Sequence, residues 1–272
     1  MLPPKAYKNM DFLNSPHARA IRILCEYEEP LRRFEEYNVT DTIVFFGSAR
    51  AKSKEQFLAK RAELEERIAN GEDLQDELIR HNKTEILSDY YEKTRELARR
   101  MTEWDLSRGS ERNYLVSTGG GPGIMEAANR GASEVPNGKS VGLGISLPFE
   151  AELNPYVTPE LGFEFHYFFT RKYWFLYLCK AMAVCPGGFG TLDELFETLT
   201  LRQTGKIKKP MPTVLFGSEY WNKLFDLNVM IDWGTIAPKD VELMFITDSV
   251  EEAFEFLTKG IEESERLERE ES

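Results

Sequence analysis

Two glycine-rich segments are the parts of this sequence best suited to chemistry, because each lacks side chains where an apolar run gives way to a helical pattern. The first, S-T-G-G-G-P-G-I-M-E, covers residues 117–126, and the second, C-P-G-G-F-G-T-L-D-E, covers residues 185–194. The first N–H groups of a helix have no intrahelical acceptor and lie at the positive end of the helix dipole. Each segment is therefore predicted to hold an anion, such as a phosphoryl group.

The glycine spacing narrows the class of ligand. The sequence has no G-x-x-x-x-G-K-[ST] motif, which excludes a P-loop for nucleoside triphosphates. G-G-G-P-G also differs from G-x-G-x-x-G, and no clear acidic residue follows at the distance expected for a dinucleotide ribose. A monophosphate therefore fits better than a dinucleotide. The alternative is that these glycines only supply positive φ angles or close helix packing.

Glu194 ends the second segment and has two interpretations. Thr191 and Glu194 form a T-x-x-E pattern, which is typical of a capping box that only stabilises the helix. Alternatively, Glu194 lies in the first helical turn beside a phosphate or sugar held by Gly188, Gly190 and Thr191. There its carboxylate could stabilise positive charge or orient a water molecule.

Thr170, Arg171 and Lys172 form a third group of interest. Thr170 is expected to be a helix N-cap, so two cations would fall in the first turn and oppose the helix dipole. A local rule broken at the edge of a binding crevice indicates a functional site. The alternative is that one cation leans away and pairs with an acid such as Glu164.

The elements that would position these residues alternate between strand and helix. The sequence predicts a doubly wound parallel α/β sheet with right-handed crossovers, whose ligands bind beyond the carboxyl ends of the strands. Predicted strands lie within residues 42–50, 113–118, 140–147, 163–169, 181–185 and 212–216, and near residues 245–246. Predicted helices cover about 16–37, 89–104, 124–132 and 170–180, the segment from the second glycine turn to 203, then 219–227, and a long helix from Ser249.

Three segments embellish this core. Residues 1–40 are predicted to form an N-terminal helical extension, and residues 41–260 the Rossmann-like domain. Within that domain, the charged residues of about 52–82 indicate an inserted solvated helix or helical hairpin. Residues 261–272 hold six glutamates and two arginines, which predicts a frayed, solvated end of the last helix.

Composition excludes several classes of function. The chain has 34 basic and 46 acidic residues, a net charge of −12, which argues against binding to nucleic acid polymers. Its three cysteines lack C-x-x-C spacing and its three histidines lie far apart, so no metal site is expected. Neither an apolar leader nor a stretch of 18 apolar residues occurs, so a cytoplasmic protein without membrane contact is expected.

Taken together, P-G-G-F-G-T-L-D-E, G-G-G-P-G-I-M-E and T-R-K resemble the LOG (Lonely Guy) family. Its members are cytokinin riboside 5′-monophosphate phosphoribohydrolases and related nucleoside 5′-monophosphate nucleosidases, often mislabelled lysine decarboxylases. The resemblance runs from about Thr42 to Ser249 and implies a Rossmann-like fold. It also implies hydrolysis of the N-glycosidic bond of a nucleoside monophosphate to free base and ribose 5-phosphate.

The resemblance also implies roles for individual residues. The family's catalytic arginine and glutamate fall on Arg171 and Glu194, and no cofactor is implied. It further implies a homodimer or larger homo-oligomer whose neighbouring chain helps to complete the site. The residues expected to bind substrate are Gly47, Ser48, Gly120, Gly121, Glu126, Lys172, Gly187, Gly188, Gly190 and Thr191.

Other functions stay open on the residues alone. The main alternative is a sensor or carrier that binds an AMP-like ligand without cleaving it, and the glycine spacing disfavours an NAD-dependent oxidoreductase. No S-x-H-K-type lysine supports a decarboxylase that uses pyridoxal phosphate. One or two of a run of aromatic residues are expected to face the pocket and stack on a base: Tyr167, Phe168, Phe169, Tyr173, Trp174 and Phe175.

Overall fold

A computed structural model describes residues 3–146 and 152–271, which form a seven-stranded sheet in the order β4-β3-β2-β1-β5-β6-β7. Every neighbouring pair of strands is parallel, which confirms the predicted doubly wound α/β fold. The strands are β1 (Asp41–Phe46), β2 (Tyr114–Thr118), β3 (Ser140–Ile145), β4 (Gly162–Phe165), β5 (Cys179–Val184), β6 (Thr213–Phe216) and β7 (Phe245–Thr247). Leu147, the end of one predicted strand, lies outside the described residues.

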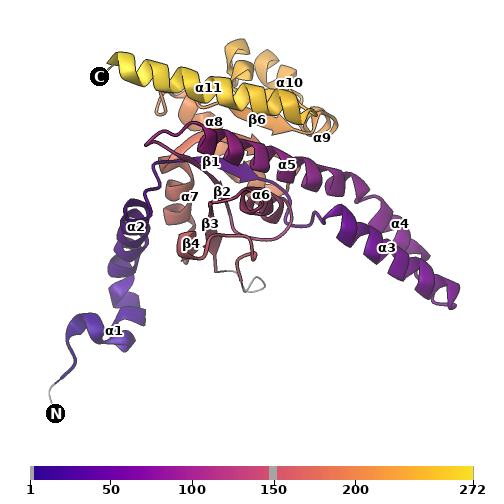
Figure 1. Ribbon diagram of the computed structural model, residues 1–272, viewed down its shortest axis with the longest axis horizontal. Helices are drawn as coiled ribbons and strands as arrows, with labels where there is room; N and C mark the ends of the chain where they lie inside the picture. The colour runs from indigo at the N-terminus through magenta and orange to yellow at the C-terminus, as the bar shows by residue number, and fades with distance from the viewer. Residues whose placement is uncertain (1–2, 147–151, 272) are drawn as a thin grey trace.

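Helices cover both faces of the sheet (Figure 1). They are α1 (Met10–Asn14), α2 (Arg19–Glu36), α3 (Lys54–Ala69), α4 (Gln75–Asn82), α5 (Glu85–Ser107), α6 (Ile124–Ser133), α7 (Phe168–Tyr177), α8 (Phe189–Gln203), α9 (Ser218–Leu224), α10 (Leu227–Asp232) and α11 (Val250–Glu271). Short 3₁₀ helices occur at Ala6–Lys8, Pro16–Ala18, Pro159–Leu161 and Pro238–Leu243. No helix in the described ranges combines the length and apolar character needed to cross a bilayer.

The central strand β1 shows why the sheet is buried on both sides. Ile43 and Phe45 pack into the core formed with α5, α6 and α11, whereas Val44 and Phe46 pack on the opposite face with α2, α7 and α8. Successive side chains of a strand point to opposite faces, so a strand covered on both sides needs a continuous apolar run. This burial accounts for the uninterrupted T-I-V-F-F sequence.

The N-terminal extension and the charged insertion lie on different sides of the sheet (Figure 1). Helix α2 packs beside α7, while α3 and α4 form a pair that projects away from the strands. Ser53 and Gln56 form a capping box at the start of α3, and the His81 ring stacks on Phe57 between the two helices. Of the two forms expected for residues 52–82, a single helix or a helical hairpin, the structure has the hairpin.

Helix α7 begins earlier than predicted, and the strand before it is shorter. Strand β4 ends at Phe165, and α7 starts at Phe168 with Tyr167 as its N-cap, so the prediction of Thr170 as N-cap was wrong. The reason is a contact with α2: Glu26 accepts hydrogen bonds from the amides of His166 and Tyr167. This distant carboxylate holds the two residues that lead into the helix, and no local sequence rule reveals it.

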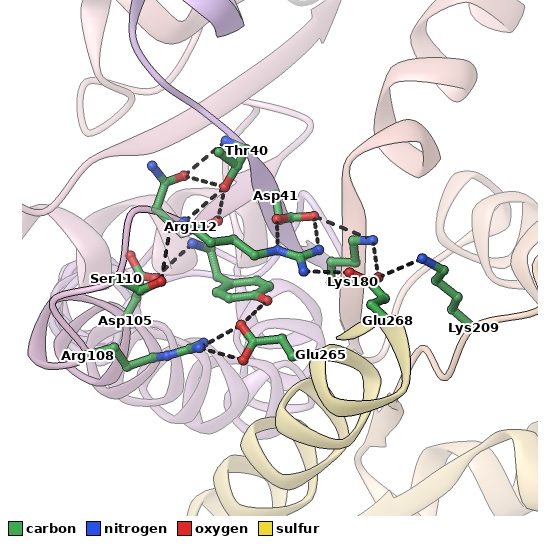
Figure 2. Close-up of polar contacts among 12 residues, drawn as sticks. Thr40, Asp41, Asp105, Arg108, Ser110, Arg112, Lys180, Lys209, Glu265 and Glu268 are labelled. Carbon is green, nitrogen blue, oxygen red and sulfur yellow. Dashed lines mark hydrogen bonds and ion pairs between the residues drawn. The ribbon is translucent and has the colours of Figure 1, made fainter. Parts of the chain in front are cut away.

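The end of α11 also differs from prediction, since it is packed rather than frayed. Glu265 is only 6% exposed and accepts hydrogen bonds from Arg108 at 2.6 Å and from the Tyr114 hydroxyl at 2.5 Å. Figure 2 shows the next turn of α11, where Glu268 meets Arg112 at 2.6 Å and Lys180 at 3.1 Å. The cations come from segments that precede β2 and begin β5, so the acidic residues are partnered across the fold.

Candidate active site

The largest cleft at the carboxyl ends of the strands opens between β1 and β5. The chain runs from β1 outward to β4 on one side and from β5 outward to β7 on the other, so this is the switch point where doubly wound sheets bind ligands. The cleft has a volume of about 550 Å³. Its lining comprises Phe46, Gly47, Ser48, Ala49, Arg50, Met125, Phe168, Arg171, Phe175, Gly188, Phe189, Gly190, Thr191, Asp193 and Glu194.

The start of α8 supplies open amides to this cleft. Gly188 is the N-cap, and its carbonyl accepts from Leu192 N at 3.1 Å, so the amides before Leu192 have no intrahelical acceptor. A Cβ added to Gly188 or Gly190 would meet no heavy atom within 4 Å, and neither residue has a positive φ. Packing and backbone conformation therefore do not explain these two glycines. Their effect is to leave the amides accessible to an anion from the cleft.

Gly187 is different, because its lack of a side chain has a packing reason. A Cβ there would lie 2.2 Å from Thr191 Oγ1, and the Gly187 carbonyl accepts a 2.5 Å hydrogen bond from the Tyr220 hydroxyl. Gly187 does not line the cleft in the described structure. It shapes the turn from behind, with Thr191 folded against it.

Glu194 is the most unusual side chain of the cleft. It is 6% exposed, and its Oε2 atom has no hydrogen-bond partner among the described residues. Burial raises the pKa of its carboxyl from 4.5 to about 7, against the opposing effect of the Lys172 and Arg171 charges. The structure therefore places an unsatisfied, easily protonated carboxyl at the cleft wall, as catalytic acids and bases often are.

The capping-box interpretation of Glu194 is not what the structure shows. Helix α8 begins at Phe189, so Thr191 is already helical and Glu194 lies in the second turn rather than the first. The N-cap Gly188 has no side chain to accept a capping hydrogen bond. Glu194 is therefore not held by the helix terminus.

Arg171 reaches the cleft from α7, whose Phe168, Arg171 and Phe175 share one helical face. Its Nε donates a 2.7 Å hydrogen bond to the Leu143 carbonyl at the end of β3, and its guanidinium lies 5.0 Å from the Phe175 ring centroid. These contacts fix the guanidinium between β3 and α8. They also confirm the expectation that one or two aromatic residues of this run face the pocket, since Phe168 and Phe175 do.

Lys172 points the other way, toward α8 rather than into the cleft. Its ammonium lies 2.5 Å from Glu197 and 3.0 Å from Asp193. Burial alone would lower the pKa of Lys172, but the hydrogen bonds with these two acids raise it above its usual value. One of the two cations was expected, as an alternative to a role in the cleft, to pair with an acid such as Glu164. Lys172 does pair with acids, but they are Asp193 and Glu197 of α8.

In the first glycine segment, the first amide of the following helix is already bonded within the fold. The Ile124 amide at the start of α6 donates to the Ser48 carbonyl at 3.1 Å, so this amide is not free to bind an anion. Gly120 and Gly121 line a smaller adjoining cavity of about 230 Å³, where their carbonyls accept from the Asn154 amide group. The segment instead makes room for Arg171, because a Cβ on Gly119 would lie 2.5 Å from its Nη2 atom.

Two other expected residues have structural contacts. Gly47 lies at the cleft, and a Cβ there would come within 2.6 Å of Ile124, so this glycine admits α6 to the end of β1. Glu126 lines neither cavity and accepts a 2.7 Å hydrogen bond from the Tyr91 hydroxyl. Sequence reasoning missed Arg50, Met125 and Asp193, although Arg50 follows the first-strand turn closely enough to have been considered.

The described residues contain no group of three or more His, Cys, Asp or Glu side chains arranged to hold a metal ion.

Comparison with known proteins adds family information. Residues 125–257 match the family described as "Possible lysine decarboxylase". A stretch of 73 residues is 36% identical to the cytokinin riboside 5′-monophosphate phosphoribohydrolase of Mycobacterium tuberculosis, and it covers 27% of this chain. These findings support the resemblance to the LOG family.

The family match includes the residues of greatest interest. Arg171, Glu194 and the whole of α7 and α8 fall within the matched residues 125–257. The aligned stretch of 73 residues spans 39% of the length of the mycobacterial relative. Among solved structures, the molybdenum cofactor binding protein of Rippkaea orientalis has 18% identity and a TM-score of 0.40, over 62% of this chain and 87% of that chain.

Proposed function

We propose that this protein hydrolyses the N-glycosidic bond of a nucleoside 5′-monophosphate, releasing the free base and ribose 5-phosphate. The observation that carries the proposal is the buried, unpartnered Oε2 of Glu194 beside the open amides of α8. A phosphate at Gly188, Gly190 and Thr191 would bring the attached sugar within reach of that carboxyl. The name of the mycobacterial relative, a phosphoribohydrolase, supports the same reaction class.

The reaction needs an anion beside the sugar. As the bond between C1′ and the base nitrogen breaks, its electron pair leaves with the base and positive charge develops on C1′ and O4′. In its ionised form, Glu194 stabilises that charge or accepts a proton from the attacking water. Arg171, which stays protonated, contacts the phosphate or the departing base. Water supplies the new C1′–O bond, and the base gains a proton.

The remote phosphate explains why a monophosphate would react better than a nucleoside. Binding energy gained at the α8 amides fixes the sugar against Glu194, although the phosphate takes no part in bond breaking.

The lysine decarboxylase description implies pyridoxal phosphate, and the cleft does not fit that group. A Schiff base requires a lysine amine, and none of the described residues that line the cleft is a lysine. The nearby Lys172 holds Asp193 and Glu197 instead. The cleft therefore does not provide the amine that pyridoxal phosphate chemistry requires.

The direct test is to incubate the purified protein with AMP and follow adenine by chromatography. Release of adenine together with ribose 5-phosphate supports the proposal. AMP that binds but stays intact indicates the sensor or carrier function, and absence of binding discredits the site. A series of nucleoside monophosphates then defines the preferred base, cytokinin riboside monophosphates included.

Glu194→Gln tests the carboxyl itself. Loss of a positioned acid–base group lowers turnover by about 10²- to 10⁴-fold, and we expect the variant to keep its fold and bind AMP. Turnover is measured at saturating AMP, with the exposed Glu219→Gln as matched control. Unchanged turnover in Glu194→Gln would refute the proposed role.

Stability provides an independent control for the same variant. Because the folded-state pKa of Glu194 is raised above 4.5, the folded protein binds the extra proton between pH 4.5 and 7, and stability falls as pH rises through that window. Above pH 7 the ionised carboxyl costs the folded state about 3 kcal/mol. Glu194→Gln should therefore unfold at higher temperature than the wild type at pH 8, and the difference should vanish near pH 4.5.

We also propose that the protein acts as a homo-oligomer. Several aromatic side chains beside the cleft are exposed, and Phe189, at the start of α8, is 91% exposed. A second copy that covers them would remove apolar surface from water and close the cleft. Light scattering should give a mass of at least two chains, and a monomer that releases adenine would disprove the proposal.

A further inference from the structure

Glu26 links the N-terminal extension to the helix that carries Arg171. One carboxylate oxygen accepts from the His166 amide at 2.8 Å, and the other accepts from the Tyr167 amide at 3.3 Å and from the Thr170 hydroxyl at 2.5 Å. In addition, the backbone carbonyl of Glu26 accepts from Trp174 Nε1 at 2.9 Å. A residue of α2 thus binds the entry, the first turn and the middle of α7.

The position of this carboxylate has an electrostatic consequence. Helix α7 carries no acidic residue in its first turn, and two cations, Arg171 and Lys172, follow close to its start. A negative charge at a helix N-terminus interacts favourably with the helix dipole. Glu26 supplies that charge from another element, and so offsets the two cations that α7 carries near its start.

Arg171 follows Thr170 directly, so the orientation of the first turn of α7 sets where the guanidinium points. Thr170 is buried and its hydroxyl oxygen lies 2.5 Å from Glu26 Oε2 and 2.8 Å from the Tyr167 carbonyl oxygen, so its single proton is donated to one acceptor or shared between them, which fixes that turn. At the other end of the side chain, Arg171 Nε reaches the Leu143 carbonyl. Movement of the first turn would break this contact and displace the guanidinium from the cleft.

We propose that Glu26 is a positioning residue that holds Arg171 in the catalytic cleft through the first turn of α7. The inference rests on the proposed function for its kinetic consequence, but the placement of Arg171 is a structural claim of its own. Glu26 lines neither the cleft nor the adjoining cavity. It therefore acts through Arg171 rather than on substrate.

The packing of α2 allows this role to be separated from simple docking of the extension. Tyr27 and Phe34 contact the Trp174 ring with centroids 5.8 and 5.3 Å apart, and Arg33 donates to the Gly162 carbonyl at 2.9 Å. These contacts do not involve the Glu26 carboxylate. A change at Glu26 alone should leave α2 in place on α7.

The kinetic test compares Glu26→Ala and Glu26→Gln with Glu28→Ala, an exposed glutamate of the same helix. Misplacement of a catalytic group lowers turnover strongly, so kcat for AMP should fall about 10- to 100-fold in Glu26→Ala. Glu26→Gln keeps one acceptor oxygen and should recover part of the loss, while Glu28→Ala matches the wild type. Circular dichroism at the assay temperature confirms that each variant is folded, and equal kcat in Glu26→Ala and the wild type would overturn the proposal.

A double-mutant cycle separates positioning from general damage. If Glu26 acts through Arg171, then Glu26→Ala should not lower kcat further in an Arg171→Ala background. Multiplied losses would show that Glu26 acts independently and would overturn the proposal.

The position of Arg171 can also be measured without turnover. In protein labelled with ¹⁵N-arginine, the Nε–H signal of Arg171, assigned with Arg171→Lys, should exchange slowly because it is bonded to the Leu143 carbonyl. In Glu26→Ala this signal should shift and exchange faster, whereas in Glu28→Ala it should stay as in the wild type. An unaltered Arg171 signal in Glu26→Ala overturns the positioning proposal, whether or not the wild type is active toward AMP. Inactivity of the wild type toward AMP would refute the proposed reaction and would leave the NMR test of Glu26 valid.

Discussion

At the scale of single residues, Glu194 and Arg171 show how opposite charges can share a cleft wall without forming a simple ion pair. The Arg171 guanidinium is tied to the Leu143 carbonyl, and Lys172 is tied to acids of α8. Their charges lower the pKa of Glu194, but burial has the larger, opposite effect. The carboxyl is thus left near the midpoint of its titration at neutral pH, which suits a group that must change its charge during a reaction.

This titration predicts a pH dependence of activity. Because Glu194 acts as a carboxylate in the proposed reaction and its pKa is about 7, kcat/KM for AMP should rise with pH through about 7 and then reach a plateau. The profile is measured from pH 5 to 9. The residual activity of Glu194→Gln should lack this rise, and a wild-type profile that falls through pH 7 would show that the protonated acid is the active form.

The sequence predicted the cleft residues that lie in continuous motifs and missed those that come from elsewhere. Gly188, Gly190, Thr191 and Glu194 follow one another along α8, so a motif with the right spacing identifies them together. Glu26 lies on a distant helix, and nothing in its neighbours along the chain distinguishes it from the adjacent Glu28. Only the packing of α2 on α7 makes the difference.

At the scale of elements, the two glycine segments have the same sequence character but different structural roles. The segment before α8 leaves amides open, whereas the Ile124 amide that begins α6 is already bonded to Ser48. Spacing along the chain cannot separate these cases, because the acceptor that closes α6 belongs to the turn after β1. The strands and most helices were predictable, since their apolar periodicity follows from burial on two faces of the sheet.

Two glycines of the α8 turn should respond differently to the same change. Gly188→Ala adds a methyl group to open space at an ordinary φ, so the fold should persist while phosphate binding weakens. Loss of one charge-assisted hydrogen bond corresponds to an increase in KM for AMP of about 10- to 100-fold.

Gly187→Ala is the matched comparison. Its new methyl group would meet Thr191 Oγ1, so we expect a lower unfolding temperature in addition to weaker binding. Thermal unfolding and AMP titration of both variants provide the measurements. A Gly188→Ala protein with unaltered KM would show that the phosphate binds elsewhere.

At the scale of the whole molecule, a network of ion pairs joins α11 to the amino ends of the central strands (Figure 2). Arg112 contacts Asp41 of β1 through two nitrogens, at 2.5 and 3.0 Å, and contacts Glu268 of α11 through the third. The cleft that we propose to be catalytic lies at the opposite, carboxyl ends of the same strands. Stability and chemistry are thus placed at opposite edges of the sheet.

The network predicts a pH-dependent contribution from Glu268. Burial alone would raise its pKa, but hydrogen bonds from Arg112, Lys180 and Lys209 lower the pKa to about 2. A lowered pKa stabilises the fold above pH 4.5 and loses this effect as pH falls toward 2. Glu268→Gln should therefore lower the free energy of unfolding by about 2 kcal/mol at pH 7.

The difference between Glu268→Gln and the wild type should shrink below pH 4.5. Denaturant unfolding at pH 7 and pH 3 measures both values, and Glu263→Gln, an exposed position on α11, is the control. Equal losses for the two variants at pH 7 would show that the network contributes nothing.

The sequence alone suggested a frayed, solvated helix end in place of this network. Residues 262–271 show their own charges, but not the cations that three other segments bring to them.

The same junction has a consequence for the order in which the protein can mature. Asp41 belongs to an early strand, and its link through Arg112 to Glu268 requires α11, which is synthesised after every strand of the sheet. In a nascent chain halted before α11, Glu268 would be absent. Of the two acids that contact Arg112, Lys180 and Lys209 in this network, Asp41 alone would then be present. Such a ribosome-bound intermediate would carry a cationic patch that the acids of α11 neutralise in the finished protein.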